Sequence, residues 1–64
     1  MEIYSTFYGE GTYADRLART FKLEGKWYIE LNGGNLEDGK FFNIISEEEG
    51  ENIAEDFCLG FRDN

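Results

Sequence analysis

The sequence lacks histidine and proline, and Cys58 is the one cysteine among its 64 residues. Without histidine, a serine or cysteine nucleophile has no ordinary general base, and the usual Cys/His zinc sites cannot form. A single cysteine also excludes a disulfide within the chain. We therefore expect no catalytic residues, no cofactor and no metal site. Cys58 lies near several carboxylates, which disfavour a thiolate, so we expect a small buried apolar residue there.

Long apolar runs and basic residues are scarce as well. No segment approaches the ~18 apolar residues of a membrane-spanning helix. The first residues, "MEIYSTFYGEG", have neither the basic start nor the long apolar stretch of a signal peptide. Fourteen acidic against six basic residues give a formal charge of −8, which disfavours attraction to nucleic acid or to an anionic membrane. We expect a cytoplasmic protein that binds neither directly.

The short chain predicts a single domain over residues 1–64. A domain of this size hides only about 60% of its unfolded surface, and small domains often compensate with disulfides or metals. Neither is available here, but aromatic residues make up 17% of the sequence. We therefore expect rings to supply much of the stabilisation.

Alternating apolar and polar residues indicate several strands. Residues 2–8 ("EIYSTFY") are rich in β-branched and aromatic side chains, and residues 26–31 ("KWYIEL") alternate in the same way. Residues 40–45 ("KFFNII") give a fourth candidate strand. Residues 32–39 ("NGGNLEDG") have the composition of a loop, and their glycines are those of turns rather than of a phosphate-binding motif.

The segment "TYADRLARTFKL", residues 12–23, fits both a helical and a strand pattern. We expect a strand from about Arg19 to Leu23, because an alternating segment follows directly after a turn. Residues 13–18 remain open between a short helical turn and a loop.

The hydrophobic pattern also bears on the register of the hairpin that follows. A two-residue loop would place Thr20 opposite Ile29, with a polar residue on the apolar face. A loop with an odd number of residues would instead place Phe21 opposite Ile29 or Trp27. We therefore predict an odd loop with a bulge near Gly25.

A C-terminal helix is predicted to begin after Ser46. Ser46 and Glu49 have the spacing of a capping box, in which each side chain satisfies a free backbone N–H. The apolar stripe that would pack on the sheet comprises Ile53, Ala54, Phe57, Cys58 and Phe61. The expected fold class is α+β: a three- to four-stranded antiparallel sheet with an acidic amphipathic helix packed on one face.

The strongest charge asymmetry lies in "SEEEGENIAEDF", residues 46–57. Residues 46–64 carry seven acids and one base, against seven acids and five bases before them. Glu51 lies four residues from both Glu47 and Glu55, a spacing at which like charges destabilise a helix, and Gly50 adds about 1 kcal/mol. One interpretation is a solvated face kept acidic for solubility. The other is a docking surface for a basic partner, which includes mimicry of nucleic acid.

Aromatic residues exceed what one helix can cover. We expect one face of the sheet to carry the side chains that contact the helix, namely Ile3, Phe7, Phe21, Trp27, Ile29 and Leu31. Tyr4, Tyr8 and Tyr28 would then point away, with Phe41 or Phe42 beside them. Exposed tyrosines combine apolar area with a hydrogen-bonding end, as interfaces require.

The function favoured by these features is a non-catalytic module that docks on a partner protein with a basic surface and modulates or inhibits it. The predicted partner-binding residues are Glu47, Glu48, Glu51, Glu55, Tyr4, Tyr8 and Tyr28. The alternative is a structural subunit or homo-oligomer that associates through the aromatic sheet face, with the acids serving only solubility. The salt dependence of binding and the oligomeric state discriminate between the two.

Overall fold

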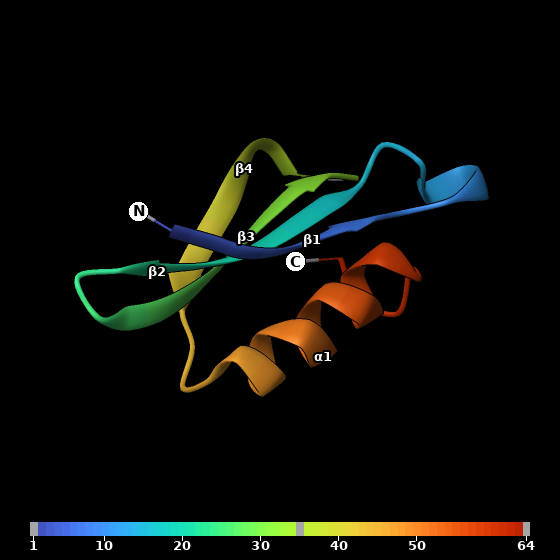
Figure 1. The fold of residues 1–64 in the computed structure, drawn as a ribbon. Coiled ribbons are helices and arrows are strands. Elements are labelled where there is room, and N and C mark those ends of the chain that lie inside the picture. The colour runs from blue at the N-terminus through green and yellow to red at the C-terminus, as the bar shows by residue number, and fades with distance from the viewer. Residues whose placement is uncertain (1, 35, 64) are drawn as a thin grey trace.

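The structure is a computed structural model that describes residues 2–34 and 36–63. Its four strands are antiparallel and lie in sequence order, so each strand pairs with the next along the chain. One helix packs across one face of the sheet and leaves the other face uncovered (Figure 1). The elements are β1 (Glu2–Tyr8), the 3-10 turn η1 (Gly11–Tyr13), β2 (Leu17–Leu23), β3 (Lys26–Gly33), β4 (Leu36–Asn43) and α1 (Glu47–Cys58). The predicted α+β class and helix placement are confirmed.

The hairpin between β2 and β3 has the two-residue loop that the hydrophobic pattern disfavoured. Leu23 pairs with Lys26, so Glu24 and Gly25 alone form the turn. Both turn residues have positive φ, 54° and 79°. Such a pair is what a type I′ turn requires, and this turn type follows the natural twist of the two strands. The predicted odd loop with a bulge at Gly25 is therefore wrong.

This register places small residues of β2 beneath the helix. Thr20 lies opposite Ile29 and Ala18 lies opposite Leu31, so all four share the covered face of the sheet. All four are 0% exposed. Phe21 lies on the other face, contrary to the prediction. The prediction failed because it assigned the larger side chains to the core, whereas a helix approaches a sheet more closely over small ones.

Strand β1 shows the same division. Ile3 lies opposite Phe21 on the uncovered face, so its predicted contact with the helix is also wrong. Phe7 lies opposite Ala18 and packs against the core, as predicted. The core cluster between sheet and helix consists of Ala18, Ile29, Leu31, Ile44, Ala54, Phe57 and Cys58, with Phe7, Trp27, Leu36, Phe42 and Ile53 packed against it.

The glycine within the acidic helix has a packing reason. Gly50 is buried at the point where α1 crosses the covered face. A Cβ at this position would lie 2.7 Å from Thr20 Cγ2 and 2.6 Å from Ile44 Cδ1. Glycine therefore lets the helix lie closer to the sheet than any other residue would, at the expense of helix propensity.

The ends of the helix agree with the sequence only in part. The Glu49 N–H donates to Ser46 Oγ at 3.2 Å, as the capping spacing predicts. The Glu49 carboxylate accepts from the Ile45 N–H, also at 3.2 Å, rather than from the N–H of Ser46. Because α1 ends at Cys58, Phe61 lies beyond the helix and is 78% exposed, so its predicted place in the apolar stripe is wrong.

The connections are shorter than predicted. Strand β3 runs to Gly33 and β4 begins at Leu36, so the predicted loop over residues 32–39 is mostly strand. Asn35, within that loop, lies outside the described residues. Residues 13–18 contain the end of η1 and the start of β2, and the strand begins two residues earlier than expected.

No helix within residues 2–34 and 36–63 has both the length and the apolar character that crossing a bilayer requires.

Candidate interaction surfaces

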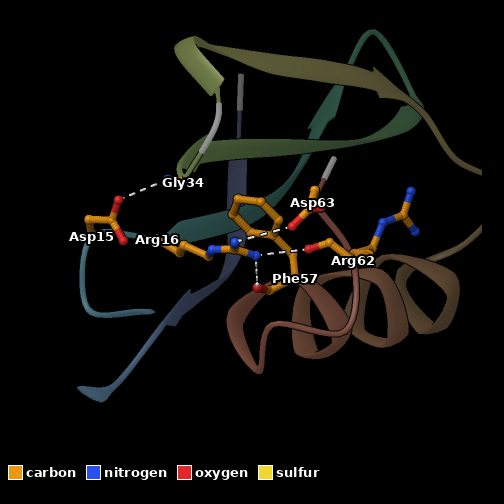
Figure 2. A network of polar contacts seen from close by, with 6 residues as sticks. All are labelled: Asp15, Arg16, Gly34, Phe57, Arg62 and Asp63. Atoms are coloured by element: carbon orange, nitrogen blue, oxygen red, sulfur yellow. Dashed lines mark hydrogen bonds and ion pairs between the residues drawn. The ribbon is translucent and has the colours of Figure 1, made fainter. Parts of the chain in front are cut away.

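A buried arginine ties the start of β2 to the end of α1 (Figure 2). Arg16 is 7% exposed, and its Nη1 donates to the carbonyl oxygens of Phe57 at 3.0 Å and Arg62 at 2.8 Å. Its Nη2 lies 3.4 Å from Asp63 Oδ1. Because Phe57 belongs to the last turn of the helix, the guanidinium lies at the negative end of the helix dipole.

Rings and glycines complete the corner around Arg16. Its guanidinium carbon lies 4.9 Å from the ring centroids of both Tyr13 and Phe57, within cation–π range. Gly60, with φ of 87°, packs where a Cβ would overlap the Tyr13 ring. Asp15 accepts a hydrogen bond from the Gly34 N–H at 2.9 Å, which fixes the β3–β4 turn beside it (Figure 2).

The Arg16 corner is therefore a structural anchor. Backbone carbonyls, one carboxylate and two rings already surround the cation, and Asp63 is mostly exposed to solvent. No role is predicted for Arg16 from the sequence. Its partners lie 41 to 47 residues later in the chain, and no local pattern connects them.

The acidic helix is defined here as α1 together with its carboxylates. Its charge faces away from the sheet. Gly50, Ala54, Phe57 and Cys58 are the buried positions of α1. Three of the predicted site residues lie on exposed or flanking positions of the helix, namely Glu48, Glu51 and Glu55. The helix sequence contains six carboxylates and no basic residue. The ion pairs Arg16–Asp63 and Arg19–Glu30 both use carboxylates outside α1.

The open face, defined here as the sheet surface opposite α1, gathers most of the remaining rings. Phe21 and Tyr28 stack with centroids 5.5 Å apart, and Phe41 lies 6.4 Å from each. This stack leaves Phe21 6% exposed, although no helix covers it. Tyr28 and Phe41 thus take the places that the aromatic-face prediction gave them.

Further apolar side chains border this stack. Ile3 and Leu23 are exposed at one end of the face, and Tyr8 lies opposite Leu17 at the other end. Phe41 is 65% exposed and Tyr8 is 73% exposed, so the face has large apolar side chains in contact with solvent. Exposed apolar side chains gathered in this number on one face of a small domain are typical of an interaction site.

The polar groups at the centre of the open face are paired with one another. Arg19 Nε donates to Glu30 Oε1 at 2.8 Å. The second oxygen of that carboxylate, Oε2, accepts from Asn32 Nδ2 at 2.9 Å. Both oxygens of Glu30 are therefore satisfied without solvent. Arg19, Glu30, Phe21, Leu23 and Phe41 line a shallow depression of about 270 Å³.

Tyr4 lies on the covered side and not on the open face. The register shifts between Ile3 and Ser5, so a bulge turns the Tyr4 side chain toward Trp27, with ring centroids 4.6 Å apart. Its hydroxyl donates to Glu2 Oε1 at 2.9 Å. This hydrogen bond raises the pKa of Tyr4, with smaller contributions from burial and from the charges of Glu2 and Glu47. Glu47 and Tyr4 are thus neighbours beside the helix start.

Cys58 is a buried free thiol in the core cluster, as predicted. Burial raises the pKa of this thiol, and the positive charge of Arg16 opposes that shift in part. The cause is therefore desolvation rather than the neighbouring carboxylates. Within the described part of the chain, no three Asp, Glu or Cys side chains converge as metal ligands would.

Comparisons of the chain with protein-family models, with curated proteins and with solved structures find no match.

Proposed function

We propose that this protein is a non-catalytic interaction module whose acidic helix docks on a basic surface of a partner protein and modulates or blocks that partner. The observation that carries the proposal is the separation of charge within the fold. Six carboxylates and no base lie in α1, whereas the strands of the open face carry the paired Arg19 and Glu30. A surface kept acidic for solubility alone has no need to concentrate its charge on one element.

The helix presents these carboxylates on a rigid support. Ser46 caps its first turn, and Arg16 binds the Phe57 carbonyl in its last turn. A surface that is ordered before binding loses little conformational entropy when the partner docks. The carboxylates span residues 47–56, or about 15 Å of helix at 1.5 Å per residue. This density approaches that of duplex DNA, about one charge per 1.7 Å, so the basic groove of a nucleic-acid-binding protein fits the proposal.

The proposal is tested by affinity capture from native lysate at low and high salt, followed by kinetics with each captured protein. The test variant is Glu48→Gln, Glu51→Gln and Glu55→Gln combined. These changes keep good helix formers and remove like-charge repulsion, so the thermal midpoint should stay constant or rise slightly. We expect the association rate with a captured basic protein to fall at least tenfold at low salt, with a flatter salt dependence.

The matched control removes the same amount of charge from outside the helix. Glu10→Gln, Glu24→Gln and Asp38→Asn change three exposed residues in loops and strands. We expect this variant to capture the same proteins, with an association rate close to that of the wild type. If both variants lose the same fraction of the association rate, the helix contributes only through net charge. Capture of no protein by the wild type from several lysates would contradict the proposal.

A further inference from the structure

We infer that the open face is the interface between two copies of this chain, packed sheet to sheet about a two-fold axis with the two acidic helices outside. This inference concerns the side of the sheet opposite α1, so it is independent of the proposed function. It commits to one occupant, a second copy of the protein. Four features of the open face support that occupant: its shape, its satisfied polar centre, its area and the charge of the molecule as a whole.

The shape of the face suits contact with itself. Phe41 projects from β4 with 65% of its surface exposed, next to the depression whose floor is the buried ring of Phe21. A two-fold interface brings the same patch together from both copies, so each surface must carry both the projection and the hollow that receives it. Leu23, at the rim of the same depression, is exposed as well and adds apolar area to the contact.

The carboxylate of the open face already has hydrogen-bond partners within the protein, so it keeps them when water is removed. Both oxygens of Glu30 already accept hydrogen bonds, one from Arg19 and one from Asn32. Covering this group would therefore leave no carboxylate oxygen without a partner. A buried ion pair also needs acceptors for the remaining N–H groups of its cation, so the second copy would have to supply these for Arg19. Thr6, opposite Arg19 on β1, keeps the adjoining part of the face uncharged.

The area of the face matches what a stable dimer needs. The molecule measures 34 × 22 × 15 Å along its principal axes. The rectangle of 34 × 22 Å that encloses a broad face has roughly 750 Å², so an interface that covers most of the face reaches the lower limit for specific complexes, about 600 Å² per partner. Aromatic residues such as Tyr28 and Phe41 are enriched in such interfaces.

The distribution of charge favours a second copy of the protein as the occupant of the open face. Residues of β2 and β3 that point from the open face include two cations, Arg19 and Lys26, and one carboxylate, Glu30. Over these two strands the face is thus nearly neutral, although the chain carries −8. Sheets pack about 10 Å apart, and each helix lies on the far side of its own sheet. The two helices would therefore be separated by more than two Debye lengths, ~16 Å at 0.15 M salt.

Sedimentation equilibrium of the wild type between 1 and about 500 µM at several salt concentrations tests the inference. We expect a monomer–dimer equilibrium with a dissociation constant near ~10 µM or tighter, as an interface of standard size allows. Salt should tighten the dimer several-fold between about 0.05 and 0.5 M, because it screens repulsion between two chains of −8. Binding of a basic partner has the opposite salt dependence, so failure of one proposal is distinguishable from failure of the other.

Two phenylalanines provide a matched pair of variants. Phe41→Lys changes an exposed ring on the open face, and Phe61→Lys changes an exposed ring beyond the end of α1. Both variants alter the net charge equally. We expect Phe41→Lys to raise the dimer dissociation constant at least 30-fold, because it replaces a ring that packs into the depression of the second copy with a charge. Phe61→Lys should change it less than threefold.

A second variant of the open face allows the same test if Phe41→Lys fails to fold. Tyr8→Lys alters a residue that is 73% exposed on the edge strand β1, and circular dichroism checks the fold of each variant. Weakened dimers in both face variants support the inference. A wild type that stays monomeric at ~500 µM in about 0.5 M salt overturns it, as does a dimer that Phe61→Lys weakens as much as Phe41→Lys.

Discussion

The two faces of the sheet bury their aromatic residues by different means. On the covered face, strand β2 contributes Ala18 and Thr20, and the helix contributes Gly50 and Ala54, so backbones approach closely around the ring of Phe57. On the open face, the same strand contributes Phe21, which Tyr28 and Phe41 shield in place of a helix.

This difference shows that apolar content alone does not decide which face of a sheet a helix covers. Both faces of β2 and β3 carry large apolar residues, so the hydrophobic pattern leaves the assignment open. The helix packs where small side chains form a groove for it. The remaining rings then lie on the open face, where Phe41 is 65% exposed, and we propose that a second molecule covers them.

The two arginines of the β2 region test the difference between the two faces most strongly. Arg16 lies at the helix end, and Arg19 lies on the open face. Arg16→Met leaves the carbonyls of Phe57 and Arg62 without their charged donor. We expect a loss of ~3 kcal/mol in the free energy of unfolding, measured by urea denaturation.

Arg19→Met is the control. Arg19 and Glu30 are each about one-third exposed, with side-chain exposures of 34% and 29%, so solvent screens their attraction. We expect a loss below ~1 kcal/mol. A loss in Arg19→Met equal to that in Arg16→Met would contradict the view that the helix side carries the structural anchor.

Gly50→Ala tests the close approach of the helix to the covered face. Alanine improves helix propensity by about 1 kcal/mol, but its Cβ would overlap Thr20 Cγ2, and overpacking costs about 1–3 kcal/mol. We expect a net loss of ~1 kcal/mol in the free energy of unfolding. Asn52→Ala, at an exposed helix position, should instead gain about 0.5 kcal/mol.

A double-mutant cycle shows whether Thr20 is the obstacle. Thr20→Ser removes the methyl group that the new Cβ would meet, so the double variant should be more stable than the sum of the single effects predicts. Strict additivity of Gly50→Ala and Thr20→Ser would mean that Ile44 Cδ1, 2.6 Å from the new Cβ, is the main obstacle.

The smallest expected effect is a pH dependence that belongs to the covered face. Because burial raises the pKa of Cys58 above its usual value of about 8.5, the folded protein holds this proton more tightly than the unfolded chain does. The stabilisation is complete below pH 8.5 and decreases as the pH rises through the pKa of the folded state. We expect unfolding curves of the wild type to weaken above about pH 8.5, and those of Cys58→Ala to lose that part of the slope.

The sequence predicted the elements more reliably than their contacts. Alternation and capping residues located β1, β3 and α1, because these signals act over a few neighbouring residues. The register of the β2–β3 hairpin depended on whether Thr20 or Phe21 faces the helix. That choice depends on the shape of the groove around Gly50, which no local pattern records.

The candidate surfaces were predicted unevenly for the same reason. Glu48, Glu51 and Glu55 lie away from the core, as their spacing along the helix predicts. Tyr8 and Tyr28 lie on the open face as expected, whereas a bulge turns Tyr4 to the other side. A bulge of this kind leaves no clear mark in a seven-residue strand that is rich in β-branched and aromatic side chains.

The Arg16 anchor also constrains the order in which the fold assembles. Adjacent strands are joined by short connections, so hairpin formation requires only local loop closure. The guanidinium, by contrast, finds its acceptors 41 to 47 residues away and remains hydrated until α1 has docked. We expect the hairpins to form early on the folding pathway and the desolvation of Arg16 to be a late step. The contacts of Arg16 would then be the last to form in folding and the first to be lost in unfolding.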